Sequence, residues 1–485
     1  MPLRLYNTRT RSTEAFAPLD GNKVRIYVCG LTPSAQAHIG HARSFLFFDV
    51  LRRYLTYAGY DVTYVQNVTD IDDRSIARAR ETGEHWYDIV SRYYASFKTS
   101  MAKLGVREPD EEPYATKFIG PIVGMIEELI AKGHAYVAKD GVYYSVPSFP
   151  RYGSLSHRNT DELQSGARIE VDEFKRDPLD FALWKFVKPG EPFWPSPWGD
   201  GRPGWHIECS AMSRELLDPA GAGFDIHGGG ADLIFPHHEN EIAQSEPLMG
   251  HPPMADVWMH GGLLLFENKK MSKSLGNFEP LEELLLRHDP QAIRLLFLQT
   301  GYSKVMNFTE ESIGAAAIGL ERLKSAYRAL RTAPARATGD AAALEAAVRE
   351  ALDADINTAG ALAELHKVAG RTAEFAQAGT DVAGAYEALL DVLGLTPNAS
   401  WLEVPPAAAL PDGTLARLRA AFDAELSLNG ASAEDAIARI LDARTQARAE
   451  KNWAESDRLR DALLACGIAI KDSKDGTTWN VAPAG

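Results

Sequence analysis

The sequence predicts an α/β fold that is built on a parallel sheet and is followed by helices and a small mixed segment. An apolar, strand-like run at 24–28 precedes a helix at about 38–58, which carries two rows of apolar residues at i,i+4 spacing. A second strand-like run follows at 61–67. Strand, helix and strand at this spacing form a βαβ unit, which requires a parallel sheet. From about residue 310 the sequence changes to alanine-rich helix.

The stretch after this unit is predicted from the same local signals. Helical patterns occur at about 85–104 and 115–132. Residues 134–146 are predicted to form a hairpin that turns at Asp140-Gly141, a strong two-residue turn signal. Residues 147–204 are rich in proline, glycine and tryptophan and show little periodicity.

These signals divide the chain into six predicted segments, with the sheet resuming near Phe224–His227. The segments are a sheet domain at 1–112 and 201–250, an insertion at 113–200, a region at 251–309, a helical bundle at 310–395, a linker with four prolines at 396–414, and a mixed domain at 415–485.

The composition is that of an ordinary globular protein and excludes several classes. With 45% hydrophobic and 24% charged residues in 485, the chain is neither disordered nor fibrous. A net charge of −15 argues against non-specific binding of nucleic acid. The chain has only three cysteines, Cys29, Cys209 and Cys466, which are far apart in the sequence and cannot make a disulfide framework; this indicates a reducing compartment. No membrane span or signal peptide is apparent, so we expect a cytoplasmic protein without membrane contact.

The first chemical feature is the run His38-Ile39-Gly40-His41 at the start of the predicted helix. Two histidines three residues apart share one face of a helix. A helix N-terminus offers unpaired N–H groups and a positive dipole end to an anion, and Gly40 permits close approach to the backbone. These properties suit a nucleotide phosphate. Two surface histidines near a helix start remain the alternative interpretation.

The second feature is the run Lys270-Met271-Ser272-Lys273-Ser274. Two lysines on a short loop can neutralise the charge of a triphosphate as it comes apart, although a solvated basic loop is common on any protein surface. A glycine run also follows His227. It fits neither common phosphate-binding fingerprint, but after a late strand of the sheet it suits a backbone-lined adenine and ribose site.

The third feature is a candidate metal site. Cys29 ends the first strand, where open sheets bind ligands, and Cys209 lies in a second polar segment. If a helix begins near residue 237, His237 and Glu241 lie on one face of it. Two thiolates, an imidazole and a carboxylate are a reasonable zinc set. From the residues alone, two buried cysteines beside a polar helix cap is the favoured interpretation.

The histidine and lysine runs together resemble the paired signatures of class I aminoacyl-tRNA synthetases. The whole chain is similar to the bacterial cysteinyl-tRNA synthetase family. The segments that carry this resemblance are 27–33, 38–41, 67–73, 201–212, 227–232, 235–244, 270–278 and 475–479.

The resemblance implies a Rossmann-type catalytic domain with an insertion, a stem-contact region with the KMSKS loop at 251–309, a helical bundle and a C-terminal anticodon-binding domain. It implies a monomer that uses L-cysteine, ATP with Mg²⁺, and tRNA(Cys). It also implies one Zn²⁺ on Cys29, Cys209, His237 and Glu241, which overturns the interpretation from the residues alone. A zinc ion that accepts the substrate thiolate distinguishes cysteine from serine better than an apolar pocket would.

The resemblance also implies roles for individual residues. The catalytic set is His38, His41, Lys270 and Lys273. The ATP and adenylate set is Gly30, Thr32, Gly40, His227, Gly228, Gly229 and Asp232, and the cysteine pocket contains Cys29, Thr69 and Trp205. The anticodon set is Arg448, Trp453, Asp457 and Asp472.

Three other functions remain open at this point. A ligase that joins cysteine to a glucosaminyl-inositol resembles the same catalytic half, but it does not account for the extended C-terminal region. A non-catalytic RNA-binding relative is expected to have degraded signatures, whereas both histidines, both lysines and all four metal-ligating residues are present here. A generic nucleotidyltransferase does not account for the metal set.

Overall fold

The protein divides into two compact units, Met1–Trp401 and Leu402–Gly485, which are described separately. The structure, a computed structural model, describes residues 2–158, 174–251, 253–270, 279–403, 413–426, 428, 432–473 and 476–481.

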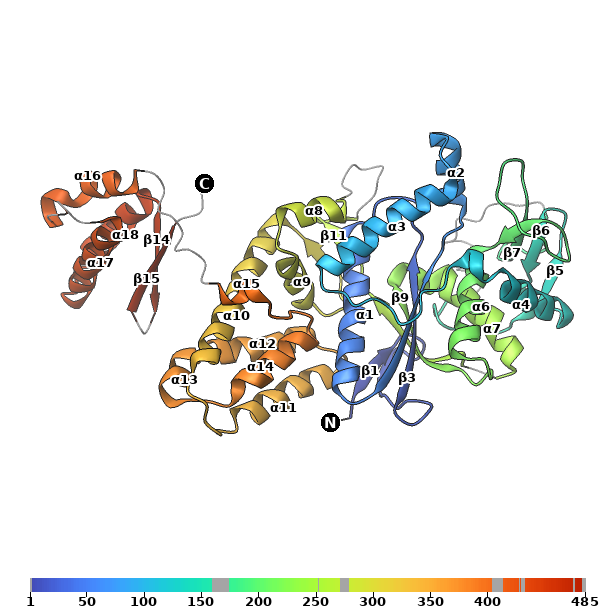
Figure 1. Ribbon diagram of the computed structural model, residues 1–485, viewed down its shortest axis with the longest axis horizontal. Helices are drawn as coiled ribbons and strands as arrows, with labels where there is room; N and C mark the ends of the chain where they lie inside the picture. The colour runs from blue at the N-terminus through green and yellow to red at the C-terminus, as the bar shows by residue number, and fades with distance from the viewer. Residues whose placement is uncertain are drawn as a thin grey trace. The chain divides into compact units, whose positions relative to one another are not determined.

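The first unit is built around a parallel sheet of four strands (Figure 1). The strands are β3 (Lys23–Leu31), β4 (Asp61–Val68), β9 (Phe224–Gly230) and β10 (Ala255–Gly261). Their order is β10-β9-β3-β4, and every neighbouring pair is parallel. The predicted α/β fold with a parallel sheet is therefore confirmed.

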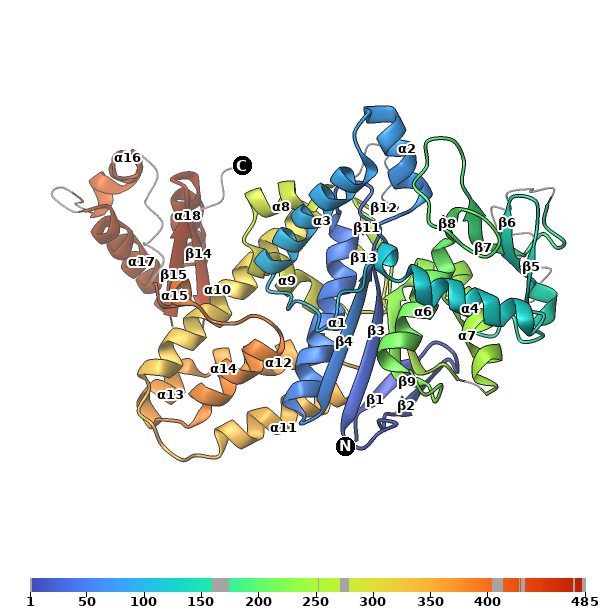
Figure 2. The same ribbon diagram turned by 45° about the vertical axis from the view of Figure 1, so that its right-hand side comes forward.

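Helix α1 (Ile39–Tyr57) connects β3 to β4 and packs along the sheet (Figure 2). The two predicted apolar rows are buried, and they consist of Leu46, Val50 and Tyr54 in one row and Phe47, Leu51 and Leu55 in the other. Burying this face stabilises the helix against the sheet far more than helix propensity does. In the sheet, β3 has β4 as its neighbour on one side and β9 as its neighbour on the other side. The chain continues from β3 through α1 to β4, and it returns to form β9 only much later. The carboxyl ends of β3 and β9 therefore form the topological switch point, where open α/β sheets bind ligands.

A four-stranded antiparallel sheet is formed by the part of the chain that follows α4 (Ile119–Ala131) and precedes α6 (Trp205–Leu217). Its strands, in the order β5-β6-β7-β8, are β5 (Ala135–Val137), β6 (Gly141–Tyr144), β7 (Phe181–Phe186) and β8 (Gly201–Pro203). The hairpin predicted at Asp140-Gly141 is the β5–β6 pair. The predicted boundary at residue 200 is wrong because β8 still belongs to this sheet. Gly201 is required there, since an added Cβ would come within 2.3 Å of the Lys185 carbonyl.

The predicted boundary at residue 250 is also wrong. Strand β10 lies beyond it and forms an edge of the parallel sheet, paired with β9. A separate small sheet follows, in the order β12-β11-β13, with β11 (Leu264–Phe266), β12 (Lys269–Lys270) and β13 (Met306–Phe308). The sequence did not reveal β10 because a buried parallel strand lacks the alternating pattern of a half-exposed one.

The remaining elements of the first unit cover the sheets or form the helical region. Those before residue 310 are β1 (Arg4–Asn7), β2 (Ser12–Ala15), α2 (Asp73–Thr82), α3 (Trp86–Lys103), η1 (Ala115–Lys117), η2 (Val146–Ser148), η3 (Ala231–Leu233), η4 (Ile234–His238), α7 (Glu239–Met249), α8 (Leu281–Arg287) and α9 (Pro290–Leu298). The helical region comprises α10 (Glu310–Thr332), α11 (Asp340–Asp353), α12 (Thr358–Ala369), α13 (Thr372–Ala378), α14 (Val382–Val392) and α15 (Ala399–Leu402). None of the helices in the described residues is long and apolar enough to cross a membrane.

The elements that the sequence analysis did not predict include α2 and α15. Helix α2 buries only Ser75 and Ile76, so it lacks an apolar stripe; capping by Asp72 and the left-handed Gly83 define its ends instead. Helix α15 lies in the predicted linker at 396–414. Its Trp401 is buried and donates a hydrogen bond to Gln291 (2.6 Å), so this part of the segment is packed.

The second unit is a small mixed domain. It contains α16 (Thr414–Leu426), α17 (Ala433–Ala449) and α18 (Trp453–Ala465), followed by the antiparallel pair β14 (Ile468–Ser473) and β15 (Gly476–Val481). Its core includes Leu418, Ile437, Leu459 and Cys466. A separate core of this kind explains why the unit is compact by itself.

A buried ion pair joins α1 to α9 within the first unit. The Asp49 carboxylate accepts a hydrogen bond from Arg294 (2.5 Å) and another from Arg53 (2.9 Å), and Asp49 and Arg294 are almost fully buried. Burial alone would raise the pKa of Asp49, but the two guanidinium groups outweigh it and lower the pKa below its ordinary value. The stabilisation is therefore complete at neutral pH and is lost as the pH falls through the folded-state pKa.

We expect Asp49→Ala to lower the free energy of unfolding by about 3–5 kcal/mol, because it leaves the Arg294 guanidinium buried without its counter-charge. Urea unfolding at pH 7 measures this loss. The control Glu84→Ala removes a carboxylate from an exposed pair with Arg92 and should leave unfolding nearly unchanged. Equal, small losses in both variants would contradict the prediction.

Candidate active site

A cavity of about 350 Å³ lies at the switch point of the parallel sheet. Cys29 and Gly30 line it from the end of β3, and His38 and His41 line it from the start of α1. The end of β9 also lines it, and so does the segment 261–264, which runs from the last residue of β10 to the first residue of β11. The cavity therefore brings together the carboxyl ends of three strands and the N-terminus of a helix.

His38 and His41 are held by the backbone at the N-terminus of α1. The Nδ1 atom of His38 accepts a hydrogen bond from the backbone N–H of Gly40 (3.1 Å), and the Nδ1 atom of His41 accepts one from the N–H of His38 (3.1 Å). The two rings stack with their centroids 3.7 Å apart. In a neutral imidazole whose Nδ1 accepts, the proton lies on Nε2. Each ring thus carries an N–H donor suited to a phosphate oxygen at the positive end of the helix dipole.

Gly30 lets β3 approach β4 at the edge of the cavity. Its N–H donates to the Asn67 side chain (2.8 Å), and an added Cβ would come within 1.7 Å of the Asn67 carbonyl oxygen. No other residue type fits this position without displacing β4. Gly30 therefore sets how closely the ends of β3 and β4 approach each other beside Cys29.

Four side chains from four different elements converge on one buried point. Cys29 lies near the carboxyl end of β3, Cys209 lies in α6, His237 lies in η4 and Glu241 lies in α7. The Cys29 sulfur is 3.7 Å from the Cys209 sulfur and 3.5 Å from Glu241 Oε1, which is 3.1 Å from His237 Nε2. The ligand atoms of all four residues lie within 4.8 Å of one another, so this cluster could hold a metal ion.

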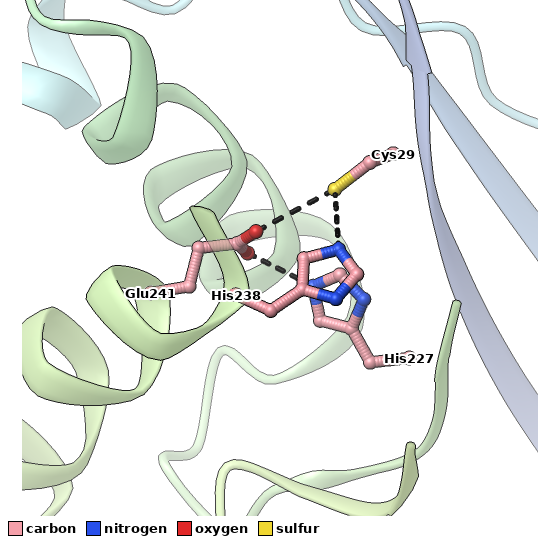
Figure 3. A group of neighbouring side chains, drawn as sticks. All are labelled: Cys29, His227, His238 and Glu241. Atoms are coloured by element: carbon pink, nitrogen blue, oxygen red, sulfur yellow. Dashed lines mark hydrogen bonds and ion pairs between the residues drawn. The ribbon is translucent and has the colours of Figure 1, made fainter. Parts of the chain in front are cut away.

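Two further histidines contact the same cluster (Figure 3). His238 Nε2 lies 3.3 Å from the Cys29 sulfur, and His227 Nε2 lies 2.8 Å from Glu241 Oε2. Behind them, His238 Nδ1 is 2.7 Å from His260 Nε2. Together with Cys29 and Glu241, His227 and His238 form a second group whose ligand atoms could hold a metal ion.

The electrostatics of the cluster favour a bound cation. Burial raises the pKa of the Cys29 thiol well above its usual value, and Cys209 and Glu241 raise it further. Burial also raises the pKa of Cys209. Burial lowers the pKa of His237 well below its ordinary value, which keeps the ring in the neutral form that ligates metals. A divalent cation would compensate two buried thiolates and a carboxylate.

The structure places most, but not all, of the predicted pocket residues around the cavity. Seven of them line it: Cys29, Gly30, Thr32, Gly40, Trp205, Gly229 and Asp232. The Trp205 ring also stacks on His237, with a centroid distance of 4.3 Å. Lys270 is the last residue of β12, and Lys273 lies outside the described residues.

Three predicted pocket residues lie behind the wall instead. His227 is fully buried against Glu241, and Gly228 packs beneath Phe48, where an added Cβ would come within 2.3 Å of the ring. Thr69 is buried and donates a hydrogen bond to Glu208 (2.9 Å). Their contact with substrate stays a prediction, and in this structure they support the residues that line the cavity.

The sequence interpretation assigned no role to His238 or His260. For His238, the doublet His237-His238 could have indicated a role, because adjacent residues of an irregular turn can both face a buried site. Nothing in the sequence connects His260 to this site, since only the pairing of β10 with β9 brings it there.

The predicted anticodon residues lie in the second unit. Arg448 is in the last turn of α17, and Trp453 begins α18 with 59% of its surface exposed. Asp457 forms an exposed ion pair with Arg460 (3.0 Å). Asp472 lies in β14 opposite Thr477 of β15.

Both units match known families. Residues 15–318 match the class I (C) tRNA synthetase catalytic domain, and residues 432–479 match the cysteinyl-tRNA ligase anticodon binding domain. The cysteine–tRNA ligase of Halorhodospira halophila is 48% identical over 98% of this chain and 99% of its own length. That of Ectopseudomonas mendocina is 47% identical over 99% of this chain and 100% of its own length. The chain belongs to the cysteine–tRNA ligase family.

Membership of the cysteine–tRNA ligase family accounts for the order of the two units. The catalytic match spans the parallel sheet, the antiparallel sheet and the small sheet that precedes α10. The anticodon-domain match spans α17, α18 and β14 and most of β15.

Solved structures share the fold of about three quarters of this chain at low sequence identity. The methionyl-tRNA synthetase of Mycobacterium tuberculosis in complex with methionyl-adenylate is 16% identical, with a TM-score of 0.57, and the alignment covers 77% of this chain and 89% of that one. A ternary complex of Agrobacterium radiobacter LeuRS with tRNA and LeuAMS is 12% identical, also with a TM-score of 0.57, over 77% of this chain and 83% of that one. At this identity the likeness shows the fold alone, which is that of class I synthetases.

Proposed function

We propose that this chain ligates L-cysteine to tRNA(Cys) in two steps. In the first step, a cysteine carboxylate oxygen attacks the α-phosphorus of ATP; the bond to pyrophosphate breaks and cysteinyl-AMP forms. In the second step, a hydroxyl oxygen of the terminal adenosine of the tRNA attacks the cysteinyl carbonyl; its proton leaves and the bond to AMP breaks. The observation that carries this proposal is one cavity with a helix N-terminus at one side and Cys29 of the metal-ligand cluster at another.

We assign zinc to the group Cys29, Cys209, His237 and Glu241. Its two sulfur donors, one nitrogen and one oxygen suit zinc better than the alternative group, which has a single sulfur. When bound, zinc would accept the substrate thiolate and lower the pKa of the substrate thiol. His238 and His227 would orient Cys29 and Glu241 through the contacts of 3.3 Å and 2.8 Å described above.

This arrangement supports the choice of cysteine over serine. The two substrates differ by one sulfur for one oxygen, and an apolar pocket rejects such an analogue only weakly. Cys29 belongs to the proposed zinc site and also lines the cavity. A thiophilic metal at this place would bind the thiolate of cysteine more strongly than the hydroxyl of serine. The ring of Trp205, stacked on His237, closes the cavity beside it.

We assign binding of the ATP phosphates to the N-terminus of α1 and to the lysines of the segment 270–274. The Nε2–H groups of His38 and His41 are positioned to donate to phosphate oxygens, and Mg²⁺ enters with ATP. Lys270 and Lys273 would follow the departing pyrophosphate, with Lys273 the stronger candidate. The protein supplies no nucleophile; it positions the substrates and stabilises charge.

We assign recognition of the anticodon to the second unit. Bases of single-stranded RNA are read by stacking on aromatic rings and by polar contacts to their edges. Trp453 offers an exposed ring, Arg448 and Asp457 offer polar groups, and Asp472 stays a candidate by its position in β14.

The experiment that tests this function is aminoacylation of total bacterial tRNA. Labelled cysteine, ATP and magnesium are supplied to the full chain, and labelled serine is supplied in a parallel reaction. We expect charging with cysteine and none with serine. Exchange of ATP with pyrophosphate that depends on cysteine, without charging of tRNA, would indicate a ligase with a different acceptor. Loss of both activities in zinc-replete protein would overturn the proposed function.

A further inference from the structure

Arg43 carries a buried guanidinium two residues after His41 on α1. Its two terminal nitrogens lie within hydrogen-bond distance of five acceptors, all of them backbone carbonyls, so at least one N–H group is shared between two carbonyls. Nη1 donates to Gly262 (3.1 Å) and Leu263 (2.8 Å), and Nη2 donates to Gly301 (3.4 Å), Tyr302 (3.4 Å) and Lys304 (2.5 Å). The residue as a whole is only 5% exposed.

These acceptors belong to two chain segments that are not adjacent in sequence. Residues 261–264 join β10 to β11, and residues 301–304 precede β13. The two segments touch at Gly262, whose N–H donates to the Tyr302 carbonyl (2.7 Å) and where an added Cβ would come within 2.4 Å of the Lys304 carbonyl. Without Arg43, five carbonyl groups at this junction would lose a charged donor.

This junction lies between the cavity and the strand that leads to Lys270. Residues 261–264 line the same cavity as His38 and His41. Strand β11 then pairs with β12, which ends at Lys270, the first lysine of the signature segment. Arg43 is therefore a direct link between the helix that carries the histidines and the small sheet that leads to the lysines.

We propose that Arg43 is a positioning residue for ATP, which holds the 261–264 wall of the cavity against the start of α1. This inference rests on the function proposed above. Arg43 acts through the backbone it binds and is not assigned a contact with substrate. A wall displaced by even 1 Å would misplace the nucleotide relative to the imidazole donors.

The chemistry of this junction requires arginine. The four N–H groups on the two terminal nitrogens of an arginine form a planar fork that can serve carbonyls from two segments at once, whereas a lysine offers three donors from one point. Burial lowers the pKa of Arg43 to about 10, so the group keeps its charge at neutral pH. A charged donor strengthens each bond to a carbonyl.

The test compares Arg43→Met and Arg43→Lys in the full chain by ATP–pyrophosphate exchange. We expect Arg43→Met to raise the KM for ATP roughly tenfold or more, the loss expected for one or two hydrogen bonds to a charged group, while the KM for cysteine and the metal content stay unchanged. Arg43→Lys should recover part of the loss. The matched control is Arg52→Met on the same helix, whose guanidinium contacts Glu108 and Asp110 and does not line the cavity; it should leave both KM values unchanged.

Unchanged kinetics in Arg43→Met would overturn the inference. So would an equal rise of the two KM values, or a loss in thermal stability with no separation between ATP and cysteine, because a purely structural role predicts those outcomes. Cysteine-dependent exchange in the unsubstituted chain is measured first. Its absence would overturn the proposed function itself, which distinguishes that failure from a failure at Arg43.

Discussion

Replacing Cys209 with serine is expected to remove most of the bound metal and to raise the KM for cysteine by at least about 100-fold. The Cys209 sulfur lies 3.7 Å from that of Cys29, so the substitution removes one of the two thiolates in the cluster. A neutral serine hydroxyl at this position is a poor ligand for zinc. The remaining sulfur, nitrogen and oxygen then hold the ion less tightly, and substrate thiolate binding weakens with it. Elemental analysis and steady-state exchange measure the two effects separately.

The matched control for this experiment is Cys466→Ser. Cys466 is also buried, but it belongs to the core of the second unit, so its substitution removes a buried sulfur without touching the cluster. We expect Cys466→Ser to keep its metal and its KM for cysteine. Full metal occupancy in Cys209→Ser would rule out the proposed ligand set, and loss of metal in both variants would point to a general effect on folding.

The second large effect is expected for His38→Asn. Asparagine is a good N-cap, so the substitution keeps a side-chain acceptor for the start of α1 while it removes the imidazole Nε2–H. If that N–H stabilises phosphate charge in the transition state, the rate of cysteinyl-AMP formation should fall by about 10²–10³-fold. Single-turnover formation of the adenylate measures this rate, and thermal unfolding checks that the helix is intact.

His85→Asn is the control for the loss of a capping histidine. His85 is the N-cap of α3, where its Nδ1 accepts the N–H of Tyr87 (3.3 Å), and it does not line the cavity. It should leave the rate of adenylate formation unchanged. A normal rate in His38→Asn, or a similar drop in His85→Asn, would show that the imidazole of His38 has no specific part in activation.

Local patterns were sufficient for the first βαβ unit and for the signature segments. The apolar rows of α1 are visible as i,i+4 spacing, and burial of Leu46, Val50 and Tyr54 follows directly from it. The positions of His38 and His41 at a helix start follow from the same pattern. The hairpin at Asp140-Gly141 was predictable because its turn chemistry is local.

Elements without a local signal were missed or misplaced. Strand β8 is three residues long and is defined by its pairing with β7. Strand β10 is buried and lacks alternation, and α2 has no apolar stripe. Short or fully buried elements are specified by their neighbours, and a pattern along the chain contains little information about those neighbours.

The sequence by itself determined the fold class, the helix that carries the histidines, and the residue types available for a metal site. Only the tertiary structure decided that the sulfur atoms of Cys29 and Cys209, which are 180 positions apart in the sequence, lie 3.7 Å from each other. It also decided that His227 and Gly228 lie behind the cavity wall, and that Arg43 joins two distant segments. The physical reason is that side-chain type and periodicity are local properties, whereas a site is formed by strand order and by packing between elements far apart in the chain.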